Sequence, residues 1–157
     1  MEEITNQQKY ENYKQQMGRL SRAMRAEFYY EAIFIAYAVL EDRTESALRH
    51  AGVYNPDRHK DLSRKLHRIE ELARQKKSLP NKYFSTELLQ QISDWKEKRN
   101  ALIHALMKNT QDQEELKQIA EEGYTLCRTL SAKVTTFKRA LEREAEKSNA
   151  KPKKTEE

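Results

Sequence analysis

The chain has few residues that break or cross-link a polypeptide: among its 157 residues are three glycines, three prolines and one cysteine. The lone Cys127 excludes an internal disulfide, and the scarcity of glycine and proline favours long helices with short connections. The longest apolar run, residues 32–40, falls far short of the ~20 residues that span a bilayer. The N-terminal Met-Glu-Glu-Ile is acidic and polar, unlike a secretory signal. We therefore expect a cytoplasmic protein with no membrane segment.

Several enzyme signatures are also missing. Three scattered glycines cannot form a phosphate-binding loop. The chain has neither a zinc-type Cys/His spacing nor His-Glu-x-x-His, and no Glu-x-x-His of a di-iron bundle. We expect His50, His59 and His67 at the surface, and Cys127 as a buried, inert thiol. Neither a metal nor another cofactor is predicted.

Apolar periodicity predicts an all-α fold, an up-and-down bundle of four to five helices. No run alternates apolar and polar residues as a strand would. The predicted helices cover roughly residues 5–17, 21–51, 55–77, 85–107 and 110–146. Residues 28–40 are apolar nearly all round, which predicts burial on several sides or a subunit interface.

Capping residues set these limits. Gly18 is a candidate break, and Gly52 suits the C-terminal cap of the second helix. Asn55-Pro56 resembles the start of a third helix, which the segment 78–81 would end. Ser85 would cap the fourth helix, and Thr110 with Gln113 fits a capping box for the fifth. The predicted organisation is an N-terminal helical extension (1–18), one helical domain (19–147) and a disordered tail (148–157).

Positive charge is concentrated in one stretch. The net charge is +5, and residues 57–82 contain nine Lys/Arg against four Asp/Glu. Arg64, Lys65 and Arg68 lie on one predicted helix and could contact the phosphates of RNA. The alternative is an ordinary solvated helix face.

Arg99 is the most informative single residue. On the fourth helix it falls within the apolar stripe of Leu88, Ile92, Trp95, Leu102 and Leu106. A permanently charged guanidinium on such a face requires a partner or a task. His104 follows five residues later, and Asn100 shares a face with His104. Histidine can move protons near neutral pH, and a guanidinium can stabilise charge developing on a phosphate.

This chemistry suits RNA cleavage, in which the 2′-hydroxyl is an internal nucleophile and no metal is required. On one helix, Arg99 and His104 lie about 140° apart, so they do not easily converge. Two helices facing each other across a two-fold axis could bring both side chains together from two chains.

The motif Arg99-Asn100-x-x-x-His104 resembles the Arg-x(4–6)-His motif of the HEPN superfamily (higher eukaryotes and prokaryotes nucleotide-binding). The resemblance in fold covers about residues 20–145. It implies a homodimeric, metal-independent endoribonuclease that leaves 2′,3′-cyclic phosphates, in a toxin–antitoxin or phage-defence setting, with an antitoxin protein as a further partner. In that case His104 is the general acid/base, Arg99 the phosphate ligand and Asn100 a polar orienter. One toxin subgroup extends the motif to His-x-Tyr, and Leu106 departs from it.

Other interpretations stay open at this point. Arg99 could pair with an acid of the second helix, for which Glu31, Glu41 and Asp42 are the candidates. His104 could simply stabilise a helix C-terminus. The chain could also be a non-catalytic HEPN-like module that binds protein, nucleotide or RNA, or a nucleic-acid binder that acts through its basic stretch alone.

Overall fold

The computed structural model describes residues 4–108 and 112–150, which form six helices and no strand. The predicted all-α class is confirmed. The helices are α1 (Asn6–Arg25), α2 (Tyr29–His50), α3 (Leu62–Ala73), α4 (Leu79–Tyr83), α5 (Thr86–Ala105) and α6 (Gln113–Ala150).

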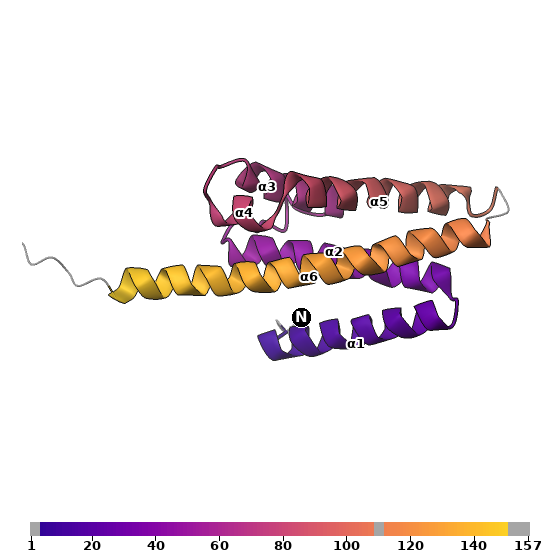
Figure 1. The fold of residues 1–157 in the computed structure, drawn as a ribbon, viewed down its shortest axis with the longest axis horizontal. Helices are drawn as coiled ribbons and strands as arrows, with labels where there is room; N and C mark the ends of the chain where they lie inside the picture. Colours follow the sequence, from indigo (N-terminus) through magenta and orange to yellow (C-terminus); the bar gives the residue numbers. More distant parts are fainter. Residues whose placement is uncertain (1–3, 109–111, 151–157) are drawn as a thin grey trace, which may run out of the picture.

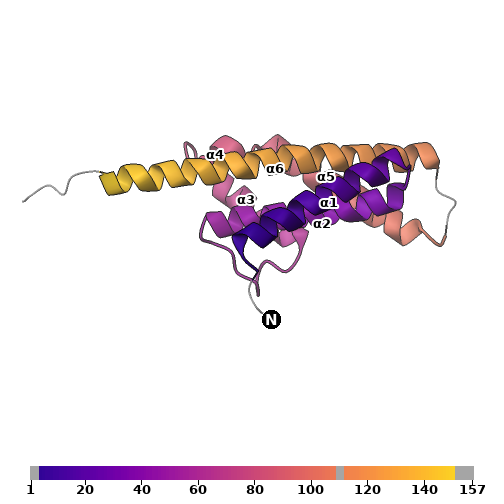
Figure 2. The same ribbon diagram turned by 90° about the horizontal axis from the view of Figure 1, so that it is seen from below.

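The four long helices run alternately up and down the molecule (Figure 1). α6 extends along its whole length, and α2 packs against α6, α1 and α3. The short α3 and α4 lie near one end, whereas the start of α2 and the end of α5 lie at the other (Figures 1 and 2). The apolar second helix is therefore central to the bundle, as its sequence predicts.

The first break in the chain is not at Gly18, as predicted, but at residues 26–28. α1 continues through Gly18 because one helical glycine costs only about 1 kcal/mol. Glu27 adopts a left-handed conformation (φ 62°), and Phe28 N–H donates to the Ala23 carbonyl at 2.9 Å. This is the Schellman geometry that glycine usually supplies. The predicted boundary at residue 18 therefore falls inside one helix.

The end of α2 follows the prediction. Gly52 has φ 73°, and its N–H donates to the Arg49 carbonyl at 3.0 Å. Val53 N–H donates to the Leu48 carbonyl at 3.1 Å, which completes a second Schellman motif. Ser85 also caps α5 as predicted, because its side chain accepts a hydrogen bond from Leu88 N–H.

The predicted start of the third helix is wrong. The Asn55 side chain accepts from Asp57 and Arg58 N–H, which caps a single turn. α3 begins only at Leu62, where the Asp61 side chain accepts from Arg64 N–H. An N-cap side chain satisfies the first free N–H groups whether or not a helix follows. An Asn-Pro pair can therefore begin either a turn or a helix, and Asn55-Pro56 begins a turn.

The predicted end of the third helix and the tail also need correction. α3 ends at Ala73, and Ser78 caps the short α4 instead of ending α3. α6 continues to Ala150, so residues 148–150 are helical rather than part of a disordered tail. Thr110, predicted to begin the last helix, and residues 151–157 lie outside the described residues.

Candidate functional site

Arg99 lies half-buried between α5 and α2. Its guanidinium carbon is 4.1 Å from the centre of the Tyr37 ring, a cation–π geometry. Its Nη1 donates to Asn100 Oδ1 at 3.1 Å, whereas Nε is buried and has no hydrogen-bond partner among the described residues. The guanidinium is thus oriented by a ring and an amide, and neither neutralises its charge.

The predicted acidic anchors of Arg99 are not used. Glu31 is exposed, Glu41 pairs with Lys65 at 2.9 Å, and Asp42 pairs with Arg43 at 2.6 Å. Within residues 4–108 and 112–150, no ion pair joins Arg99 to a carboxylate. The aromatic ring of Tyr37, one helical turn before Glu41, takes that place. Sequence reasoning missed Tyr37 because it searched the second helix only for acids.

Tyr37 keeps a neutral ring beside the arginine. Burial, together with the nearby Glu41, raises the pKa of the Tyr37 phenol, although the positive charge of Arg99 lowers it. At neutral pH the phenol is therefore protonated, and the ring offers its electron-rich face to the guanidinium.

His104 lies at the exposed end of α5, one turn after Asn100. Among the described residues no hydrogen bond or ion pair joins the His104 imidazole to Arg99. Within one chain the two side chains are thus both available but not in contact, as their spacing on the helix predicts.

Several large apolar side chains near the start of α2 and the end of α5 are exposed. Phe34 is 68% exposed and Met107 is 93% exposed. Tyr30, Phe34 and Tyr37 follow one another at helical spacing along α2. Because α2 begins where α5 ends (Figure 1), these residues share one end of the bundle with Arg99 and His104. The full set is Phe28, Tyr30, Phe34, Ile103, Leu106 and Met107, named here the apolar end patch.

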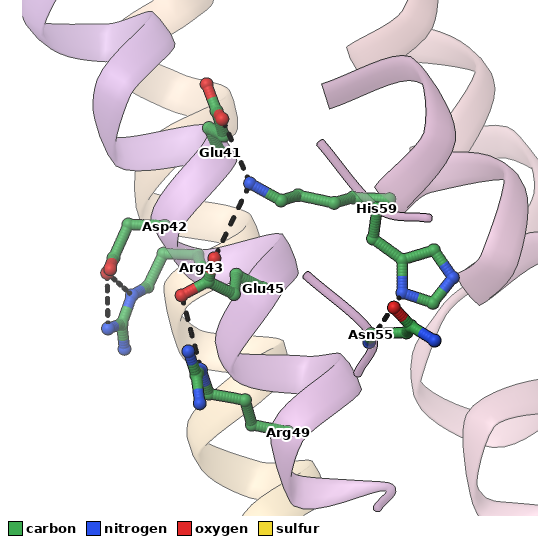
Figure 3. Close-up of polar contacts among 8 residues, drawn as sticks. Glu41, Asp42, Arg43, Glu45, Arg49, Asn55 and His59 are labelled. Atoms are coloured by element: carbon green, nitrogen blue, oxygen red, sulfur yellow. Dashed lines mark hydrogen bonds and ion pairs between the residues drawn. The ribbon is translucent and has the colours of Figure 1, made fainter. Parts of the chain in front are cut away.

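The predicted RNA contacts on the third helix have different environments. Arg64 is exposed, and Arg68 pairs with Glu71 at 2.9 Å. The Lys65 side chain, in contrast, is only 6% exposed, and its ammonium lies 2.9 Å from Glu41 and 3.6 Å from Glu45. Both carboxylates point into the space between α2 and α3 (Figure 3). Lys65 therefore joins two helices and is not placed to contact a phosphate.

Two further residues differ from the predictions or extend them. His59 was expected at the surface but is buried, and its Nδ1 accepts a hydrogen bond from Asn55 N–H at 3.0 Å. Cys127 is buried as predicted, where its thiol donates to the Ala36 carbonyl, and burial raises its pKa to about 12. Such a thiol is not a nucleophile at neutral pH.

In comparisons with known proteins, no family model, no curated protein and no solved structure matches this chain. No helix in the described part of the chain is long and apolar enough to cross a bilayer. Nor do residues 4–108 and 112–150 group three or more His, Cys, Asp or Glu side chains that could bind a metal ion.

Proposed function

We propose that this protein is a homodimeric, metal-independent endoribonuclease of the HEPN type, active in a toxin–antitoxin or phage-defence setting in the cytoplasm. The observation that carries the proposal is the apolar end patch, whose exposed residues lie near the start of α2 and the end of α5, at the same end of the bundle as the Arg99–His104 motif. Large exposed apolar patches on small proteins mark interaction surfaces. A two-fold contact through this patch would bring two copies of the motif face to face.

The roles in this site follow from the side chains. Arg99, held by Tyr37 and Asn100, binds the scissile phosphate and stabilises its developing charge, which a preoriented cation does without further rearrangement. His104 moves protons to and from the 2′-hydroxyl and the leaving 5′-oxygen. Asn100 orients the guanidinium. The products are a 2′,3′-cyclic phosphate and a 5′-hydroxyl.

The test is cleavage of an RNA oligonucleotide by purified wild type and His104→Ala protein. We expect the variant to lose about 10²- to 10⁴-fold of the cleavage rate, because general acid–base catalysis contributes that much. His50→Ala is the matched control, since His50 is also a terminal helix residue but lies at the end of α2. Equal cleavage by wild type and His104→Ala would refute this role for the histidine.

Mixing variants tests whether the site is shared. Arg99→Ala and His104→Ala proteins should each be inactive alone. If one chain's arginine acts with the other chain's histidine, mixing them should restore part of the activity. Active Arg99→Ala homodimers would contradict the proposed phosphate ligand.

A second function is supported by the same patch. A non-catalytic HEPN-like module would use the apolar end patch for association alone, and Arg99 would then stabilise the α2–α5 contact through Tyr37. In that case neither the wild type nor any variant cleaves RNA, and Arg99→Ala mainly lowers the melting temperature of the protein. Cation–π contacts of this kind contribute about 0.5–2 kcal/mol.

A further inference from the structure

A basic pocket lies on the α3 side of the molecule, apart from the Arg99–His104 motif. Its volume is about 630 Å³, within the range of small-ligand sites. Its charged lining comes from the turn after residue 55 and from one face of α3. The residues used below are Arg58, His59, Arg64, His67, Arg68 and Glu71.

Positive charge exceeds negative charge in this pocket. Glu71 lies 2.9 Å from an Arg68 nitrogen and 3.0 Å from His67 Nε2, and the hydrogen bond from Arg68 lowers the pKa of this carboxyl. Arg64 has only a loose contact with Asp61, at 3.6 Å. For Arg58, no carboxylate partner occurs in the part of the chain that the structure describes. Two guanidinium groups therefore remain largely free to bind an anion.

His59 adds a further hydrogen-bond donor to the same pocket. The residue as a whole is 8% exposed, and its Nδ1 accepts a hydrogen bond from the Asn55 backbone N–H. The ring proton consequently lies on Nε2. Figure 3 shows that Nε2 points away from Asn55, and no described residue accepts its hydrogen bond. Nε2 is not among the buried polar atoms that lack a partner in the described residues, so it is accessible and can donate a hydrogen bond to a ligand in the pocket.

The N-terminal turn of α3 adjoins this pocket, since Ser63 and Arg64 belong both to that turn and to the lining. A helix N-terminus carries partial positive charge and favours anions. No Phe, Tyr or Trp side chain lines the pocket among the described residues, whereas three arginines do. The recognition chemistry is that of phosphate groups.

From this arrangement we infer that the pocket of Arg58, His59, Arg64 and Arg68 binds a phosphate-bearing ligand through its phosphate oxygens. Guanidinium groups bind phosphates bidentately, and His59 Nε2 donates a further hydrogen bond. The inference does not depend on RNA cleavage, because it uses none of the residues of the Arg99–His104 motif. The phosphates belong either to a free polyphosphate compound or to an RNA strand.

The test is calorimetric titration of the full chain with pyrophosphate, ATP and adenosine. A short RNA is titrated into the full-length His104→Ala variant, which leaves this RNA intact. We expect pyrophosphate and ATP to bind and adenosine not to bind. Arg58→Ala/Arg64→Ala should weaken affinity by about ten-fold for each arginine, since each variant side chain loses a charge-assisted hydrogen bond to phosphate. Both side chains are exposed, so the double variant should fold.

Two controls make the outcomes distinct. Lys76→Ala/Lys82→Ala removes the same charge from the same basic stretch but outside the pocket, and it should leave pyrophosphate affinity unchanged. His59→Asn keeps an acceptor for Asn55 N–H and removes the Nε2 donor, so it should weaken binding without unfolding. Binding of RNA alone, lost in the arginine variant, would assign the phosphates to RNA. If no probe binds, or if both double variants lose affinity equally, the inference is wrong.

Discussion

At the scale of single residues, Arg99 lies against an aromatic ring: its guanidinium carbon is 4.1 Å from the centre of the Tyr37 ring, and no described carboxylate pairs with it. A charged residue within an apolar stripe is visible from periodicity alone. Whether a carboxylate or an aromatic ring satisfies it depends on which turn of α2 lies opposite, and helical spacing does not contain that information. The structure places Tyr37 there, while Glu41 faces Lys65 one turn further on.

Lys65 illustrates the same point in reverse. Its place among the many Lys and Arg residues of the segment 57–82 predicted an exposed side chain that contacts RNA phosphates. Lys65 is instead the most buried Lys or Arg of that segment. Two carboxylates of α2 compensate the cost of its burial. Composition counts charges but does not show which of them face inward.

Glu45 gives a prediction for pH dependence. Burial raises the pKa of its carboxyl, but hydrogen bonds from Tyr54 and Arg49 and the charge of Lys65 outweigh burial, so the pKa is lowered overall. A lowered folded-state pKa stabilises the protein above the unfolded value of 4.5, and this stabilisation disappears as pH falls through the folded-state pKa. Glu45→Gln should therefore be less stable at pH 7 by about 1 kcal/mol.

Urea unfolding of both proteins at several pH values measures this difference. The difference in the free energy of unfolding between wild type and Glu45→Gln should shrink as the pH drops below 4.5. Glu144→Gln, at an exposed position of α6, is the control and should differ little from wild type at any pH. A gap that is constant with pH would mean that the charge of Glu45 does not stabilise the fold.

At the scale of elements, helices were predicted well and their ends less well. Periodicity extends over many residues, so errors at single positions average out. A helix end depends on one or two residues, and Glu27 has no sequence signature of the left-handed conformation that it adopts. Gly52 does, which explains why one Schellman end was foreseen and the other was not.

Gly123 provides a prediction for the contact of α5 with α6. A Cβ atom there would lie 2.6 Å from Trp95 Cζ2, and the indole is fixed because its Nε1 donates to the Ile119 carbonyl at 2.8 Å. Gly123→Ala should therefore destabilise the protein by about 1–3 kcal/mol through overpacking, despite better helix propensity. Thermal unfolding followed by circular dichroism measures the effect.

Gly18 is the matched comparison. A Cβ atom there would meet only the Arg22 guanidinium, at 3.3 Å, which is the far end of a flexible, exposed side chain. Gly18→Ala should raise stability by up to about 1 kcal/mol, because alanine favours a helix interior. The critical result is that the two variants change the stability of the protein in opposite directions. Stabilisation by Gly123→Ala would contradict the close packing around Trp95.

At the scale of the whole molecule, the apolar end patch predicts self-association. Phe34→Ser should shift the protein from dimer to monomer in sedimentation velocity, with its melting curve little changed, because Phe34 is exposed within one chain. Tyr10→Ser removes another exposed aromatic ring, from the N-terminal half of α1, and should leave the dimer intact. A wild type that stays monomeric at high concentration would argue against the shared site.

The sequence alone determined the helical class, the long apolar second helix and the position of the Arg-Asn-x-x-x-His motif, because these are periodic or local properties. Only the tertiary structure decided which side chain lies against Arg99, that Lys65 and His59 face inward, and that exposed apolar residues of α2 and α5 share one end. These properties depend on how helices distant in sequence pack together. The physical reason is that a buried group is satisfied by whatever the opposing helix presents, and only packing determines that.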